Sequence, residues 1–248
     1  MARIALILGH GATFSGTLKD KKEMFLSTPY GKPSAKIETG IYNGMDLIIL
    51  NRHGKDGSIP AFQVNYKANM FALKEMKTDI IFATSLCGSL QEEIITGEFV
   101  VFDQFIDLTT HKELTYSDKI DINELNHSAF NKPFSDSVRD CFIEAAVING
   151  LTIHTKGTVI AVDGPRQSTR AESNLFRSWK ADVVNTTTAP EAILAHELNI
   201  PYGALSLCTY YDSWRTDIPP ASHNEKIQIL KEHKKQLSEL LKSAIARL

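Results

Sequence analysis

The sequence has few of the features that mark secreted, membrane-bound or nucleic-acid-binding proteins. Its three cysteines, Cys87, Cys141 and Cys208, are far apart and have no metal-binding spacing, which argues against a disulfide framework or a metal site. No apolar run approaches the roughly 18 residues of a membrane helix, and the first run, Ile4–Leu8, is shorter than a signal-peptide core of about 7–15 residues. Lys+Arg total 27 and Asp+Glu 29, so the basic excess typical of nucleic-acid binders is missing. These absences predict a cytoplasmic protein with no membrane or nucleic-acid partner.

Short apolar runs alternate with helical patterns along the 248 residues. The runs predict buried strands at Ile4–Leu8, Leu47–Leu50, Ile80–Ala83, Phe99–Phe102, Val159–Val162, Asp182–Val184 and Gly203–Leu207. Apolar residues at helical spacing predict helices at Val64–Met76, Asp136–Asn149, Glu191–Leu198 and Asn224–Arg247. The alternation indicates an α/β fold, and without a linker or repeat we expect one domain over residues 1–248. The polar stretch 109–131 is expected to be a long loop.

Small and polar residues follow four of these strands. In open α/β sheets, ligands bind beyond the carboxyl ends of the strands. Gly9-His10-Gly11 offers backbone N–H groups to an anion, and Arg52-His53 adds a fixed cation. Hydroxyl-rich turns follow at 85–89 and 185–188. Each pattern alone is common in ordinary turns, but the four together favour one anion pocket.

Eight further segments have a characteristic order across nearly the whole chain. They are Thr28–Ser34, Arg52–Gly54, Val64–Ala68, Cys87–Leu90, Asp103–Thr110, Gly164–Arg166 with Arg170–Ser173, Ala181–Glu191 and Tyr211–Trp214. In these segments the chain resembles the trimeric purine nucleoside phosphorylase superfamily, in its methylthioadenosine phosphorylase branch.

The resemblance implies a fold and a reaction. The fold is a mixed, twisted β-sheet, partly closed into a barrel and surrounded by helices. The enzyme is a pentosyltransferase of purine salvage, in which a purine nucleoside and phosphate give free base and pentose 1-phosphate. Phosphate is a co-substrate, and neither a cofactor nor a metal is implied. Members are homotrimers that complete each active site with a residue of the neighbouring subunit.

The resemblance also assigns site residues by position. The phosphate set is Gly9, His10, Arg52, His53, Ser85, Leu86 and Thr187. The nucleoside set is Cys87, Gly88, His127, Gln167, Ser168, Thr186, Tyr210, Asp212 and His223. Arg52 and His53 are the catalytic phosphate ligands, and Asp212 holds or protonates the purine N7 atom. His127 matches the position lent across the trimer interface.

Several positions depart from the family pattern. His10 replaces a usual Thr or Ser, Gln167 an apolar residue against the purine, and Thr186 a Met against the ribose. Tyr210 replaces the first of two base-reading Asp residues, which leaves 6-amino and 6-oxo purines both open. His223 and Lys226 stand where the methylthio branch has apolar residues, so a 5′-hydroxyl or charged 5′ group is expected to fit better than a thioether.

Two other functions remain open on these residues. His10 raises the possibility of a nucleoside hydrolase, in which water replaces phosphate. The departures in one pocket also fit a catalytically weakened homologue that binds a nucleoside. Purine release with and without phosphate would separate the three readings.

Overall fold

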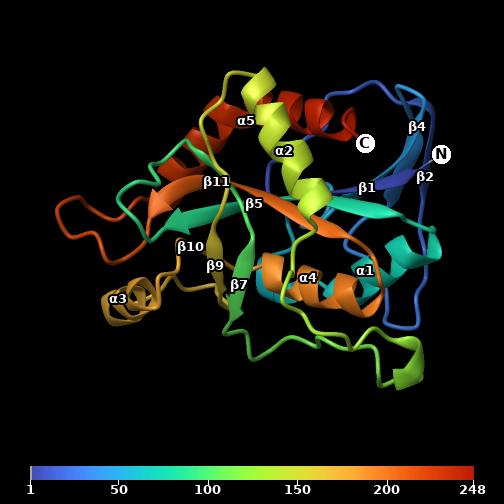
Figure 1. The fold of residues 1–248 in the computed structure, drawn as a ribbon, viewed down its shortest axis with the longest axis horizontal. Coiled ribbons are helices and arrows are strands. Elements are labelled where there is room, and N and C mark those ends of the chain that lie inside the picture. Colours follow the sequence, from blue (N-terminus) through green and yellow to red (C-terminus); the bar gives the residue numbers. More distant parts are fainter. Residues whose placement is uncertain (1) are drawn as a thin grey trace.

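The fold is built on one mixed β-sheet, and the computed structural model describes residues 2–248 (Figure 1). Within that range the strands are β1 (Arg3–Leu8), β2 (Lys19–Met24), β3 (Ile37–Tyr42), β4 (Met45–Asn51), β5 (Ile80–Ser89), β6 (Phe99–Val101), β7 (Gln104–Asp107), β8 (Ile153–His154), β9 (Thr158–Ala161), β10 (Val183–Asn185) and β11 (Tyr202–Tyr211). The main path runs β2-β3-β4-β1-β5-β10-β9-β7, while β11 pairs with β5 and leads on to β6 and β8.

Strand β5 is the branch point of the sheet. Its first half pairs with β1, from Ile4↔Ile80 to Ile7↔Ala83, and its last residues pair with β10. Strand β11 runs parallel along its other edge. The end of β5 is therefore enclosed between β10 and β11. The described strands leave β2, β7 and β8 as open ends, so the expected partial closure into a barrel is not confirmed.

A β-bulge in β11 changes which way its last side chains point. Cys208 pairs with Cys87, but the next pair is Tyr210 with Gly88, so Thr209 is an extra residue. Paired residues point to the same face, and successive residues alternate. The bulge therefore places Tyr210 on the face of Gly88, opposite to the face of Cys208.

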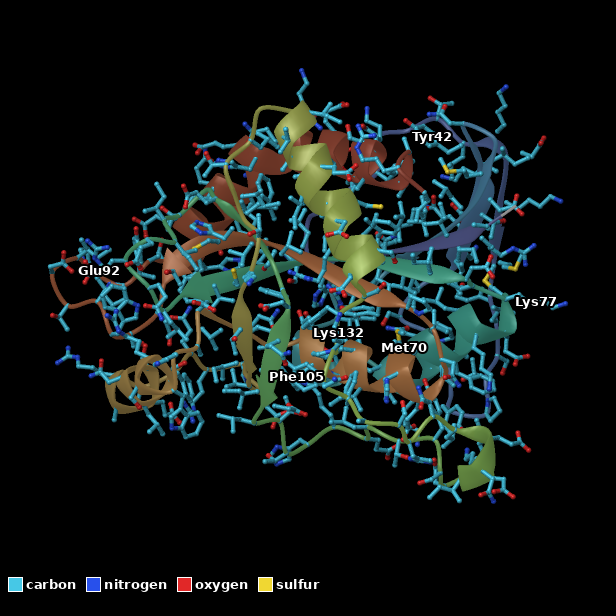
Figure 2. The ribbon with its side chains drawn as sticks, viewed as in Figure 1. Tyr42, Met70, Lys77, Glu92, Phe105 and Lys132 are labelled. Atoms are coloured by element: carbon cyan, nitrogen blue, oxygen red, sulfur yellow. The ribbon has the colours of Figure 1, made fainter. Side chains whose placement is uncertain are left out.

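Helices cover both faces of the sheet (Figure 1). They are α1 (Tyr66–Glu75), α2 (Asp136–Ile148), α3 (Arg170–Ser178), α4 (Thr188–Glu197) and α5 (His223–Ile245), with short 3-10 turns at Ala61–Gln63 and Ile122–Glu124. Helices α1 and α4 contact each other on one side, and α2 contacts α5 on the other. Met70 of α1 is fully buried in the hydrophobic core that α1 and α4 form with the sheet, whereas Lys77 and Glu92 are exposed at the rim (Figure 2).

The sequence-based elements are mostly confirmed. All seven apolar runs lie in or at strands, and all four expected helices are present, although α4 begins three residues early, at Thr188. The segment 109–131 contains only one 3-10 turn. Strands β2, β3, β7 and β8 and helix α3 were not anticipated. None of the helices formed by residues 2–248 is long and apolar enough to cross a membrane.

Candidate active site

A cavity of about 460 Å³ gathers most of the predicted site residues. Its lining includes His10, Arg52, His53, Ser85, Leu86, Gln167, Ser168, Thr186, Thr187, Tyr210 and His223, together with Lys226. Five predicted residues, all within the described part of the chain, lie outside this lining: Gly9, Cys87, Gly88, His127 and Asp212. The four segments do converge on this cavity, but residues 85–89 lie within β5 and not in a turn after it, so that expected turn was wrong.

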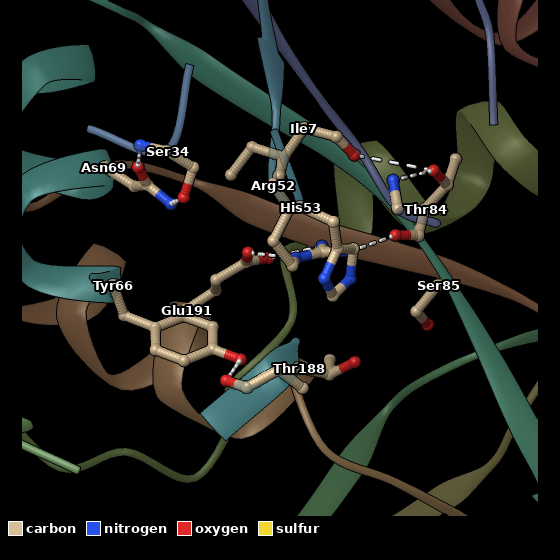
Figure 3. Close-up of polar contacts among 12 residues, drawn as sticks. Ile7, Ser34, Arg52, His53, Tyr66, Asn69, Thr84, Ser85, Thr188 and Glu191 are labelled. Atoms are coloured by element: carbon tan, nitrogen blue, oxygen red, sulfur yellow. Dashed lines mark hydrogen bonds and ion pairs between the residues drawn. The ribbon is translucent and has the colours of Figure 1, made fainter. Parts of the chain in front are cut away.

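Arg52 lies directly after β4, and three of its guanidinium N–H groups are hydrogen-bonded to Glu191 and Thr84 (Figure 3). Its Nε donates to Glu191 Oε1 at 2.5 Å and its Nη2 to Glu191 Oε2 at 2.8 Å, while Nη1 donates to the Thr84 carbonyl at 2.7 Å. The Tyr202 hydroxyl also donates to Glu191, at 2.8 Å. A guanidinium has five N–H groups, so one on each Nη atom remains for an anion.

The pair is completely buried, with 1% of the Arg52 side chain and 0% of Glu191 exposed. Burial alone would lower the pKa of Arg52, but the facing Glu191 carboxylate outweighs it and raises that pKa. Arg52 is therefore a permanent cation in a fixed orientation, which suits a phosphate ligand.

Gly9 allows close packing beside Arg52. Its N–H donates to Thr84 Oγ1 at 3.0 Å, so it is not free for phosphate. A Cβ atom on Gly9 would lie 2.6 Å from the Thr84 carbonyl oxygen and 3.0 Å from Arg52 Nη1. The glycine lets β1 and β5 approach Arg52 closely, and its place in the phosphate set stays a prediction.

His53 is fixed by its own loop. Its Nδ1 lies 2.8 Å from the Ile59 carbonyl oxygen, and the Ile59 N–H donates back to the His53 carbonyl at 3.0 Å. Burial, reinforced by the charge of Arg52, lowers the pKa of His53 to about 4. His53 is therefore a neutral ring at neutral pH. The ring of His10 lies beside it, with centroids 5.8 Å apart.

Hydroxyl groups complete this end of the cavity. The Ser85 hydroxyl donates to Ser206 Oγ at 3.0 Å. Thr187 is the N-cap residue of α4, and its side chain makes no capping hydrogen bond. Its hydroxyl and the first N–H groups of α4 are thus available to an anion.

Tyr210 separates the cavity from Asp212. The Tyr210 ring covers Gly88, where a Cβ atom would lie 2.5 Å from the ring, and Lys226 Nζ is 3.9 Å from the ring centroid. Asp212 lines a neighbouring cavity of about 960 Å³, which shares Gln167 and Tyr210 with the first. The predicted N7 partner and the covered Gly88 therefore do not face the phosphate cavity directly.

The Asp212 carboxyl is buried without a hydrogen-bond partner. Only 2% of the residue is exposed, and neither oxygen accepts a hydrogen bond. Burial raises the pKa of Asp212, and the nearby hydroxyls of Ser168 and Ser173 and the charge of Lys226 offset this only in part. A carboxyl with a raised pKa is suited to carrying a proton.

Cys87 and His127 both lie outside the cavity lining. Cys87 is 1% exposed, and its thiol lies next to that of Cys208 rather than in the cavity. His127 is on an exposed loop, with Nε2 3.0 Å from the Ile122 carbonyl oxygen.

The sequence analysis missed two buried charged groups next to the site. Glu191 begins an expected helix and lies in one of the family segments but was given no role, although an acid among the apolar residues of a helix is itself a signal of a buried partner. Lys112 of the long loop donates to the Thr186 carbonyl at 3.0 Å and lies 3.5 Å from Asp163. No sequence pattern indicates that Lys112 would reach this point. Residues 2–248 contain no group of three His, Cys, Asp or Glu side chains placed to hold a metal ion.

Comparisons with known proteins agree along the whole chain. The model of the phosphorylase superfamily matches residues 3–246. S-methyl-5′-thioadenosine phosphorylase of Ciona intestinalis is 39% identical over 245 residues, covering 98% of this chain and 88% of that protein. The enzyme of the same name from Pyrococcus abyssi is 39% identical over 248 residues, covering 100% and 93%.

Solved structures show the same fold. Methylthioadenosine phosphorylase from Schistosoma mansoni, in complex with adenine, has a TM-score of 0.91 and 30% identity, covering 99% of this chain and 91% of that one. The match is to the full mixed sheet and its helices. The chain therefore belongs to the phosphorylase superfamily, as a pentosyltransferase that cleaves purine nucleosides with phosphate to free base and pentose 1-phosphate.

Proposed function

We propose that the 460 Å³ cavity is the catalytic centre, with phosphate at the end lined by Arg52 and the purine at the end lined by Ser168 and Tyr210. The observation that carries this assignment is the fixed guanidinium of Arg52, which keeps two N–H groups free beside the Ser85 and Thr187 hydroxyls. Phosphate under the sugar would stabilise the positive charge that develops as the glycosidic bond breaks.

The leaving purine needs a proton or a strong hydrogen bond at N7. Asp212 is the proposed donor, because its buried carboxyl has a raised pKa and no other partner. Since Tyr210 lies between the cavity and Asp212, the tyrosine ring must shift from Gly88 before the base meets the carboxyl.

The proposed substrate is a 6-aminopurine nucleoside. Support comes from relatives named for S-methyl-5′-thioadenosine and from structures of the Schistosoma mansoni enzyme with adenine or methylthioadenosine bound. The 5′ end is expected to differ from those relatives. His223 and Lys226 line the cavity, and burying a thioether against polar groups would leave them without hydrogen bonds, at about 1–3 kcal/mol each.

The test is base release from adenosine, inosine and 5′-methylthioadenosine, with and without phosphate. We expect release to require phosphate and kcat/KM for adenosine to equal or exceed that for 5′-methylthioadenosine. Arg52→Ala should raise the KM for phosphate strongly. Release that ignores phosphate would identify a hydrolase, and binding without release a weakened homologue.

We also propose a homotrimer of one-domain subunits in the cytoplasm. Free Cys87, Cys141 and Cys208 fit a reducing compartment. The exposed position of His127, outside its own cavity, fits a residue that serves a neighbouring subunit. Light scattering should give three times 27.6 kDa, and an active monomer would contradict the proposal.

A further inference from the structure

We propose that His53 selects the oxyanion: its Nε2 atom accepts a hydrogen bond from the hydroxyl of the phosphate dianion, so the site prefers phosphate and arsenate over sulfate. This inference rests on the proposed function of the cavity as a phosphate site. It adds a specificity-determining role to a residue so far treated only as a phosphate ligand.

The hydrogen-bond partner of Nδ1 fixes the tautomer. Nδ1 lies 2.8 Å from the Ile59 carbonyl oxygen, and a carbonyl oxygen can only accept, so Nδ1 must carry the hydrogen. In a neutral imidazole the other nitrogen is then an acceptor. The Ile59 N–H donates to the His53 carbonyl at 3.0 Å, which closes the loop 53–59 on itself and holds the ring.

The surroundings keep the ring neutral. Arg52 is the neighbouring charge, and burial together with this charge lowers the pKa of His53 to about 4. The carboxylate nearest to Arg52, Glu191, is already occupied by Nε and Nη2 of Arg52 and by the Tyr202 hydroxyl. The other ring beside His53 is His10, at 5.8 Å between centroids.

The other groups at this end of the cavity are able to donate. The Ser85 hydroxyl already donates to Ser206, but Arg52 has two spare N–H groups, Thr187 has a hydroxyl that makes no capping bond, and the first turn of α4 presents backbone N–H groups. All of them serve any oxyanion equally. Nε2 of His53 differs, because it needs a hydrogen on the ligand. At neutral pH the phosphate and arsenate dianions keep one hydrogen, whereas sulfate has none.

The experiment compares three anions on the intact enzyme, with adenosine as the nucleoside. Sulfate is measured as a competitive inhibitor against phosphate, and arsenate as an alternative co-substrate. For the wild type we expect the Ki of sulfate to exceed the KM of phosphate at least tenfold, the equivalent of about 1.4 kcal/mol. The KM of arsenate should stay close to that of phosphate.

His53→Gln is the informative variant. A glutamine amide can turn either its N–H or its C=O toward the ligand, so the preference for phosphate over sulfate should fall to within about threefold. The matched control is His233→Gln, which makes the same change outside the cavity lining, in a ring whose Nδ1 also lies 2.8 Å from a carbonyl oxygen, that of Ile229, and it should leave the ratio of the two constants unchanged.

Two results would overturn the inference. One is sulfate binding to the wild type as tightly as phosphate, and the other is an unchanged ratio in His53→Gln. The wild-type comparison decides the matter even if the variant does not fold. Base release that continues without any anion would instead refute the proposed function and the inference with it.

Discussion

The Arg52–Glu191 pair offers the sharpest test of how the site is held. Glu191→Gln keeps the shape of the side chain and one acceptor oxygen but removes the charge. Arg52 would then be a buried cation with 1% of its side chain exposed and no counter-ion. Removing one partner of a buried pair typically costs about 3–5 kcal/mol. Because glutamine still accepts one hydrogen bond, we expect the lower end, about 3 kcal/mol.

A loss of that size is a large share of the roughly 5–15 kcal/mol that stabilises a typical domain. Equilibrium unfolding in urea at one fixed protein concentration should show a clearly lower midpoint for Glu191→Gln. The KM for phosphate should rise at the same time, because Arg52 loses the carboxylate that orients it. The matched control is Glu239→Gln, which breaks the half-exposed pair with Lys242 and should barely move the midpoint. Equal midpoints for wild type and Glu191→Gln would refute the reasoning.

The remaining predictions concern the purine and sugar ends. Asp212→Asn should lower kcat about 100-fold on adenosine and far less on an N7-methylated nucleoside, whereas equal losses would indicate damaged binding. Burial raises the pKa of folded Asp212 above its unfolded value, so its stabilising contribution is complete below about pH 4 and is lost as pH rises. Asp212→Asn should therefore be more stable than wild type at pH 7.5 but not at pH 3.5, as urea midpoints would show. Gly88→Ala would force the Tyr210 ring away and, because the ring must leave Gly88 before the base meets Asp212, should lower the KM for nucleoside without changing that for phosphate; an unchanged KM would place Tyr210 outside the base path. His223→Leu should shift the kcat/KM ratio roughly tenfold towards 5′-methylthioadenosine, and a ratio that stays constant would exclude His223 from the 5′ pocket.

The sequence predicted the interior of the sheet better than its edges. Buried strands such as β1 and β4 are continuous apolar runs, so they stand out. Strand β2 has the sequence KDKKEM and is exposed at every residue, so no apolar alternation marks it. Helix α3 is also poor in apolar residues, but its capping box of Thr169 and Glu172 was a readable start signal.

The candidate site was also predicted only in part. Arg52 and Thr187 follow buried strands, and they lie together with Ser85 of β5 because the strand ends meet at one edge of the sheet. The exclusion of Asp212 by Tyr210 depends on a side-chain position and on one extra residue in β11, which no residue-type pattern encodes. Lys112 reaches the site through a loop of irregular structure, and its path is likewise set by tertiary packing.

The bulge at Thr209 decides which side chain covers Gly88. Because Cys208 pairs with Cys87 and Tyr210 with Gly88, a regular ladder along the same chain would set Thr209 opposite Gly88 and turn Tyr210 to the opposite face of the sheet. A threonine would then cover Gly88 in place of the tyrosine ring, and the residues that lead to Asp212 would change faces with Tyr210. Deleting Thr209 would instead leave Tyr210 directly after Cys208 and still opposite Gly88, so the extra residue could be lost without moving the ring to the other face.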